Sequence, residues 1–251
     1  MKKLSISKVL GSIILPILFF LFWSWCGNTG RLNTNLIPTP EILWQTFLDM
    51  VEKGTLQKNI AISFSRVLKG YAIGLLAGLF AGVCLGLSKR LGTLFSFFTG
   101  LLRPIPIIAW VPILILFLGI DEEYKVAMIA IGSFWPILLN TTQGIRGVSQ
   151  SHIEVARMYE KSKLEILTDV ILPEALPSIF TGMRLGIGSA WSCVVGAEML
   201  AAASGIGYVI MYAREMFHPE VMYVGVLSIG LVGLLIDFVI LRIQNFVLRW
   251  M

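Results

Sequence analysis

Long apolar runs alternate with short charged segments along the whole chain. A helix that crosses a bilayer needs about 20 mostly apolar residues. The six candidate spans are residues 9–26, 67–88, 103–119, 124–143, 178–203 and 221–247. Within lipid only helices and closed barrels satisfy every backbone hydrogen bond, and the sequence lacks the alternating ten-residue strands of a barrel. The pattern therefore predicts an all-α polytopic membrane protein with about six transmembrane helices.

Composition supports this prediction. Hydrophobic residues make up 56% of the 251 residues and charged residues only 14%, with a mean hydropathy of +0.81, whereas soluble domains carry about 25% charged residues. The net charge of +5 is dispersed and leaves no basic tract for a nucleic-acid partner. The three cysteines lie in or beside apolar runs without C-x-x-C spacing, so neither disulfides nor a metal site is expected.

The first run follows a basic start, a combination that also occurs in cleaved signal peptides. It exceeds the usual core of about 7–15 residues and no A-x-A-like site follows it, so an uncleaved first span is expected. Lys and Arg are modestly enriched in the loops on the N-terminal side, which predicts cytoplasmic termini. The expected organisation is a first span with an outer amphipathic segment (1–66), a core permease domain (67–247) with a cytoplasmic loop (144–177), and a cytoplasmic tail (248–251).

Glycine recurs at every fourth position of the second span. Residues four apart share one helix face, so this stripe forms a groove that another helix can approach closely. Packing within the chain is the expected role, and a subunit interface is the alternative. The stripe consists of Gly70, Gly74, Gly78, Gly82 and Gly86.

Three prolines, Pro104, Pro106 and Pro112, surround the third span. An interior proline removes a backbone hydrogen bond and bends a helix. Residues 91–118 are too long for one straight crossing, so an interfacial piece followed by a kinked span is expected.

The polar loop between the fourth and fifth spans carries two helix-start patterns. Ser151 with Glu154 and Ser162 with Glu165 each have the spacing of a capping box. They predict two short helices with a break near residues 160–161, and the second helix should end at Leu172 because a proline follows. Only the second helix has a clear apolar face for the bundle, formed by Leu164, Leu167, Val170 and Ile171. The first therefore suggests a docking helix for a cytoplasmic partner, and a plain connector is the alternative.

At these residues the chain resembles the permease subunits of binding-protein-dependent ATP-binding cassette (ABC) importers. Their loop signature, E-A-A, three residues, G, nine residues and I-x-L-P, matches in spacing. The matched residues are Glu154, Val155, Ala156, Glu160, Val170, Ile171, Leu172 and Pro173. The stretches LRPIPIIAWVPILILFLGI, LPEALPSIFTGMRLGIGSAW, VVGAEML and SGIGYVI resemble the branch that imports nitrate, sulfonates, taurine and bicarbonate.

This resemblance implies a type I importer fold in the bacterial inner membrane. It also implies a permease homodimer, cytoplasmic ATP-binding subunits that dock on the first loop helix, and an extracytoplasmic substrate-binding protein. The chain departs from the signature at Glu160, where a glycine belongs. Either the turn is built differently or Glu160 extends the first helix by one residue.

Charged residues within membrane spans are candidates for function. Arg184 and Asp237 are expected to pair near the cytoplasmic side. Glu198 has no evident cationic neighbour in sequence and is a candidate for the pathway or gate, together with Trp191 and Ser192.

Two other classes of protein fit the sequence less well. A self-sufficient secondary transporter or channel could use Glu198 and Asp237, but it would not explain the two loop helices. A membrane enzyme is disfavoured because His152 and His218 lie in loops on opposite sides, without a catalytic or metal cluster. The sequence also lacks the P-loop motif G-x-x-x-x-G-K-[ST], so it predicts no ATP-binding site and no cofactor.

Overall fold

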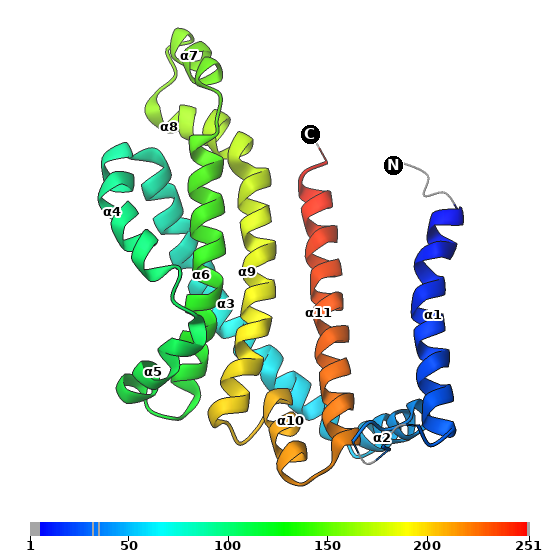
Figure 1. The fold of residues 1–251 in the computed structure, drawn as a ribbon. Coiled ribbons are helices and arrows are strands. Elements are labelled where there is room, and N and C mark those ends of the chain that lie inside the picture. Colours follow the sequence, from blue (N-terminus) through cyan, green and yellow to red (C-terminus); the bar gives the residue numbers. More distant parts are fainter. Residues whose placement is uncertain (1–5, 32, 35, 250–251) are drawn as a thin grey trace.

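A computed structural model describes residues 6–249 except residues 32 and 35. Every regular element in this part of the chain is helical, which confirms the all-α class (Figure 1). The elements are α1 (Ile6–Asn28), α2 (Pro40–Glu52), α3 (Thr55–Leu87), α4 (Lys89–Leu102), the 3-10 helix η1 (Ile107–Trp110), α5 (Val111–Leu118), α6 (Glu122–Arg146), α7 (Gln150–Met158), α8 (Lys163–Ile166), the π-helix η2 (Leu167–Ile171), α9 (Leu172–Ala201), α10 (Ile206–Glu215) and α11 (Pro219–Val247).

The centre of the bundle consists of α3, α6 and α9, which contact one another along their lengths. Helix α6 lies between the other two. Its fully buried Ile137 meets Gly78 of α3 on one side and Gly186 of α9 on the other. Small residues on both outer helices thus let their backbones approach α6 closely.

The glycine stripe of α3 faces α6 over its whole length. Each glycine lies against one residue of a second series that also advances by four, in the pairs Gly70–Ile129, Gly74–Ser133, Gly78–Ile137, Gly82–Thr141 and Gly86–Ile145. The stripe is therefore occupied within one chain, and it is not free to form a subunit interface.

Three helices in the described part of the chain are long and apolar enough to cross a membrane: α3, the helix that is continuous from Lys163 to Ala201, and α11. Helix α6 has 25 residues, about 37 Å at 1.5 Å per residue, so it is also long enough to cross. It is more polar than the other spans because it is enclosed by α3 and α9.

The expected kinked span at 103–119 is not a single bent helix. Helices α4 and η1–α5 form a pair bent by 89° at a short break, and together they are long and apolar enough for one broken span or a re-entrant loop. Pro106 caps η1 and Pro112 lies at the start of α5, where a missing N–H costs nothing. The prolines therefore begin new helices at a break and do not bend a continuous one.

The crossings leave two distinct ends of the bundle. The beginning of α1, the end of α11 and the loop elements α7 and α8 lie at one end, whereas α2, α5 and α10 lie at the other (Figure 1). Helix α1 stands apart from α3, α6 and α9. Many of its apolar side chains are exposed, including Leu15 and Phe19, as expected of a helix that faces lipid.

Candidate functional site

The first loop helix, α7, is anchored at its beginning by a residue outside the predicted site. The helix starts at Gln150 with Ser149 as its N-cap, so the predicted capping role of Ser151 is wrong. The carboxylate of Glu174, in α9, accepts the Ser149 N–H at 3.0 Å and lies 2.8 Å from Nδ1 of His152. Glu174 therefore satisfies a free helix-terminal amide of α7 and ties α7 to α9.

The second capping box is present as predicted. The Glu165 N–H donates to Oγ of Ser162 at 3.3 Å, and the Ser162 N–H donates to Oε2 of Glu165 at 2.7 Å. The expected packing of Leu164 is wrong, because its side chain is exposed and Ile166 is the residue buried here. The box fixes the start of α8 directly after the turn that follows α7.

The second loop helix does not end at Leu172. Residues 163–201 form one continuous helix in which η2 is a π-helical segment. A proline ring clashes with the carbonyl four residues earlier in an α-helix, and the wider π turn before Pro173 relieves this conflict. The sequence rule that a proline stops the preceding helix was overridden here, so the loop is rigidly continuous with α9.

The turn after α7 has the geometry that a glycine would normally provide. Glu160 has a φ of 57°, the Lys161 N–H donates to Ala156 O at 3.2 Å, and the Glu160 N–H donates to Arg157 O at 2.9 Å. These are the two hydrogen bonds of a Schellman motif. Both readings of Glu160 from sequence are therefore wrong: the helix ends at Met158, and the turn keeps its usual form.

We expect Glu160→Gly to stabilise the protein. A non-glycine residue in the left-handed region costs roughly 1–2 kcal/mol, and glycine offers no such penalty. The measurement is the thermal unfolding midpoint of the purified permease in detergent, which should rise. Tyr159→Gly is the control, since Tyr159 has a φ of −81° and gains nothing from glycine. Equal midpoints for Glu160→Gly and the wild type would show that the backbone of Glu160 is not strained.

Helix α7 exposes apolar side chains at its free end. Met158 is 84% exposed and Tyr159 79%, and Val155 on the same helix is also exposed. Ala156 is the buried residue of α7, and Glu154 points outward with only Gln150 as a hydrogen-bond partner. A nine-residue helix with little to bury is marginal by itself. This exposed end is therefore a candidate docking surface.

A buried polar cluster lies at the opposite end of the bundle. The Glu198 carboxylate accepts hydrogen bonds from Arg66 Nη1 at 2.8 Å, Ser63 Oγ at 2.8 Å and the Gly207 N–H at 2.9 Å. Glu198 is 1% exposed. No cationic neighbour of Glu198 is evident in the nearby sequence, and the fold provides one in Arg66 of α3, 132 residues earlier.

Arg66 extends the cluster across three helices. Its Nε and Nη2 donate to the Glu122 carboxylate at the start of α6, both at 2.6 Å. Its Nη1 also donates to the carbonyl of Ser204 at 2.7 Å, and Lys125 contacts Glu122 at 3.1 Å. The cluster thus joins α3, α6, α9 and the turn that leads into α10.

The turn into α10 is shaped around Glu198. Gly205 has a φ of +107°, and a Cβ at this position would meet the Glu198 carboxylate. Asn59 accepts the Gly205 N–H at 2.8 Å, and Ser63 Oγ accepts the Ile206 N–H at 3.0 Å. The stretch SGIG therefore closes over the carboxylate, and only glycine fits the second position.

The proposed pathway residues separate into two groups. Glu198 and Trp191 are buried within the chain, and Trp191 Nε1 donates to the Ile229 carbonyl of α11 at 3.1 Å. Both side chains are thus held inside the chain by contacts with other helices. Ser192 is exposed, and it belongs to a stripe along α9 that the rest of the chain leaves uncovered: Thr181, Leu185, Gly188, Ser192 and Met199.

Arg184 and Asp237 form a bidentate ion pair between α9 and α11. The distances are 2.6 Å from Nε to Oδ1 and 2.7 Å from Nη2 to Oδ2. Two parallel N–H···O bonds are the strongest form of such a pair. It links the halves of α9 and α11 nearer to the loop end of the bundle.

The spanning helices and the loop define a polytopic helical membrane protein. The model for the family "Binding-protein-dependent transport system inner membrane component" matches residues 74–251, and the chain belongs to this family. The family resemblance expected from the loop signature is confirmed. The protein is a multi-pass inner-membrane permease of an ABC importer, and ATP hydrolysis belongs to a separate subunit.

Individual relatives agree with this assignment. The aliphatic sulfonates transport permease protein SsuC of Bacillus subtilis is 35% identical to this chain, and the alignment covers 95% of this chain and 86% of SsuC. The bicarbonate transport permease CmpB of Synechococcus elongatus is 33% identical, and that alignment covers 96% of this chain and 91% of CmpB. A solved inward-facing structure of the methionine ABC transporter MetNI contains a chain of the same fold, with a TM-score of 0.69, 18% identity, and coverage of 78% of this chain and 97% of that one.

Proposed function

We propose that two copies of this chain form the transmembrane path of an importer for a small oxyanion of the sulfonate, taurine, nitrate or bicarbonate type. ATP-binding subunits would dock on α7 in the cytoplasm, and an extracytoplasmic binding protein would deliver the solute to the opposite end. The observation that carries the proposal is the end of α7: exposed apolar side chains on a short helix that is firmly fixed to α9.

The loop can transmit movement because it is rigid. Glu174 fixes the beginning of α7, the Schellman turn and the capping box fix its end, and η2 continues without a break into α9. A push on α7 therefore reaches α9 directly. Helix α9 also carries the uncovered stripe that includes Thr181 and Ser192. Both hydroxyls donate to carbonyls of their own helix, and small polar residues are typical of the faces on which membrane helices meet, which supports a second copy or a water-filled path beside this stripe.

The cargo follows from the relatives and from the charges within the membrane. Sulfonate and bicarbonate, carried by SsuC-type and CmpB-type systems, are both small oxyanions. Two arginines of the spanning helices are already paired within the chain, Arg66 with Glu198 and Arg184 with Asp237. An arginine neutralised by a carboxylate binds an anion weakly, so selectivity would lie with the binding protein.

The alternative of a self-sufficient ion-coupled transporter has lost its support. It required free membrane carboxylates, and Glu198 and Asp237 each bind an arginine. Neither carboxylate is therefore available to exchange an ion at little cost.

The docking role of α7 is tested by Met158→Asp. Burying even a neutral polar group without a partner costs about 1–3 kcal/mol and a charge costs more, so we expect recovery of the ATPase subunit with the tagged permease to fall by at least about 10-fold. ATP-driven uptake of an alkanesulfonate or bicarbonate into proteoliposomes should fall with it. The matched control is Met216→Asp, because Met216 is an exposed methionine at the opposite end. Retention of both assembly and uptake in Met158→Asp would refute the docking surface.

A further inference from the structure

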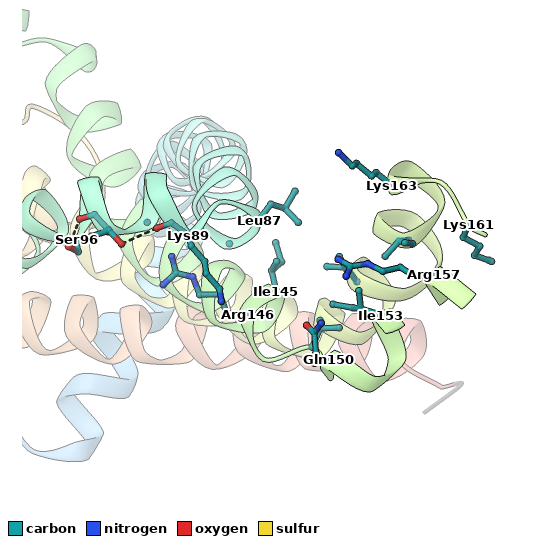
Figure 2. A pocket seen from close by; sticks show the side chains of 16 residues that line it. Leu87, Lys89, Ser96, Ile145, Arg146, Gln150, Ile153, Arg157, Lys161 and Lys163 are labelled. Carbon is teal, nitrogen blue, oxygen red and sulfur yellow. Dashed lines mark hydrogen bonds between the residues drawn. The ribbon is translucent and has the colours of Figure 1, made fainter. Parts of the chain in front are cut away.

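A cavity of about 1090 Å³ lies between the α7–α8 loop and the adjacent ends of α3, α4 and α6. One wall is the junction of α3 and α4 with the end of α6, and it includes Leu87, Lys89 and Arg146. The other wall is formed by α7 and α8, with Ile153 and Arg157 among its residues (Figure 2). The cavity reaches the last turn of α7 through Arg157, whereas the exposed Met158 and Tyr159, to which the ATPase docking is assigned, do not line it.

The cavity is strongly basic. Five cations line it: Lys89, Arg146, Arg157, Lys161 and Lys163. Figure 2 shows Arg157 and Lys163 extending across the gap toward the side of Lys89 and Arg146. Among the described residues that line the cavity there is no carboxylate.

Most of this charge is not neutralised by the chain. Within the described residues only Lys161 of the five forms an ion pair, with Asp169 at 2.6 Å. Arg146 is held in place because its Nη2 donates to the Leu85 carbonyl at 2.9 Å. The beginning of α4, capped by Ser88, contributes the positive end of its dipole, since Lys89, Gly92 and Thr93 line the same cavity.

A general excess of cations on the cytoplasmic side would not produce this arrangement. That rule concerns the side of the membrane, and it does not require cations from three separate segments to line one cavity without an acid. Like charges that line one cavity repel each other, so an anion in the cavity would relieve an unfavourable arrangement.

The cavity borders a surface suited to lipid. Helix α4 runs from it with no buried residue, and its exposed side chains include Leu94, Phe97 and Phe98. Basic pockets between membrane helices at the cytoplasmic surface bind anionic headgroups. An acyl chain could therefore lie on α4 while its phosphate enters the cavity, beside Thr93 and Ser96.

We propose that this cavity is a binding site for a phosphate-type oxyanion, supplied either as the headgroup of an anionic lipid or as free phosphate. Occupancy would bridge α4 and the α7–α8 loop, and so connect the membrane surface to α7, the helix on which the ATP-binding subunits are proposed to dock. This inference rests on the proposed function only for that connection, because binding can be measured without transport.

The test uses the full-length permease purified in detergent. Its thermal unfolding midpoint is measured at increasing concentrations of dihexanoyl-phosphatidylglycerol, dihexanoyl-phosphatidylcholine or inorganic phosphate, at constant ionic strength. Each Lys or Arg near an anionic lipid contributes about 1 kcal/mol, or about fivefold in affinity. The double variant Lys89→Gln with Lys163→Gln should raise the half-saturating concentration by about 25-fold. The control, Lys53→Gln with Lys58→Gln, removes two exposed cations at the opposite end and should leave it unchanged.

The three ligands distinguish the two possible sources of the anion. Stabilisation by phosphatidylglycerol alone, weakened in the double variant, identifies a lipid headgroup, and a corresponding effect of phosphate identifies the free ion. Equal titrations of the double variant and the wild type, or no stabilisation by either anion, would overturn the proposal. So would loss of the ATPase subunit from the double variant without any anion effect, because the cavity would then belong to the ATPase contact. None of these readouts depends on Met158.

Discussion

Replacing Arg66 with methionine is expected to destabilise the folded permease by about 3–5 kcal/mol, because it leaves buried carboxylate charge without its cation. The Glu198 side chain has no exposure and would keep only the hydroxyl of Ser63 and one backbone amide as donors. Glu122 would lose its bidentate partner, although it is partly exposed and retains Lys125. We expect little folded protein after extraction, and a lower thermal unfolding midpoint for what remains.

Two further variants test whether the loss of stability comes from the buried ion pair itself. Arg214→Met removes an exposed arginine from α10, near the same end of the bundle, and should change the midpoint little. Glu198→Gln in the Arg66→Met background removes the uncompensated charge, so the double variant should be more stable than Arg66→Met alone. This non-additivity is the mark of a direct pair. If Arg66→Met were no more harmful than Arg214→Met, the cluster would not hold the bundle together.

The cluster could not be predicted from the sequence, and the reason is distance along the chain. Glu198 and Arg66 are 132 residues apart, and nothing local to either residue indicates the other. The helix α3 also begins at Thr55, twelve residues before the apolar run that marked it, so Arg66 stood outside the predicted span. From sequence alone Glu198 is therefore a candidate for the pathway or gate without a partner, and the fold adds Arg66 as that partner.

Features that depend on local periodicity were predicted better. The glycine stripe could be predicted because residues four apart share a helix face whatever lies opposite. The Ser162 capping box could be predicted because both of its partners lie within one helical turn. Local rules failed where the loop is fixed by distant residues. Glu174 replaced Ser151 in fixing the start of α7, and the π-helix carried the chain past Pro173.

The packing of α3 on α6 leads to the second large expected effect, which follows Gly74→Ala. A Cβ at Gly74 would lie 2.5 Å from the Ala130 carbonyl oxygen and closer still to Oγ of Ser133. A carbonyl of α6 cannot rotate away as a flexible side chain could, so the two helices must separate. Overpacking typically costs about 1–3 kcal/mol, and this site should lie at the upper end because main-chain atoms collide.

The stripe offers a graded series that tests this mechanism by thermal unfolding. A Cβ at Gly78 would meet its nearest atoms at 3.0–3.1 Å, and one at Gly188 on α9 would meet nothing within 4 Å. Stability should therefore fall in the order Gly188→Ala, Gly78→Ala, Gly74→Ala, and Gly188→Ala should be neutral or favourable because alanine is the better helix former. Adding Ser133→Ala to Gly74→Ala should restore only part of the loss, since the Ala130 carbonyl remains. Full restoration would assign the clash to the hydroxyl alone, and equal midpoints for all three single variants would show that α3 and α6 do not need this close approach.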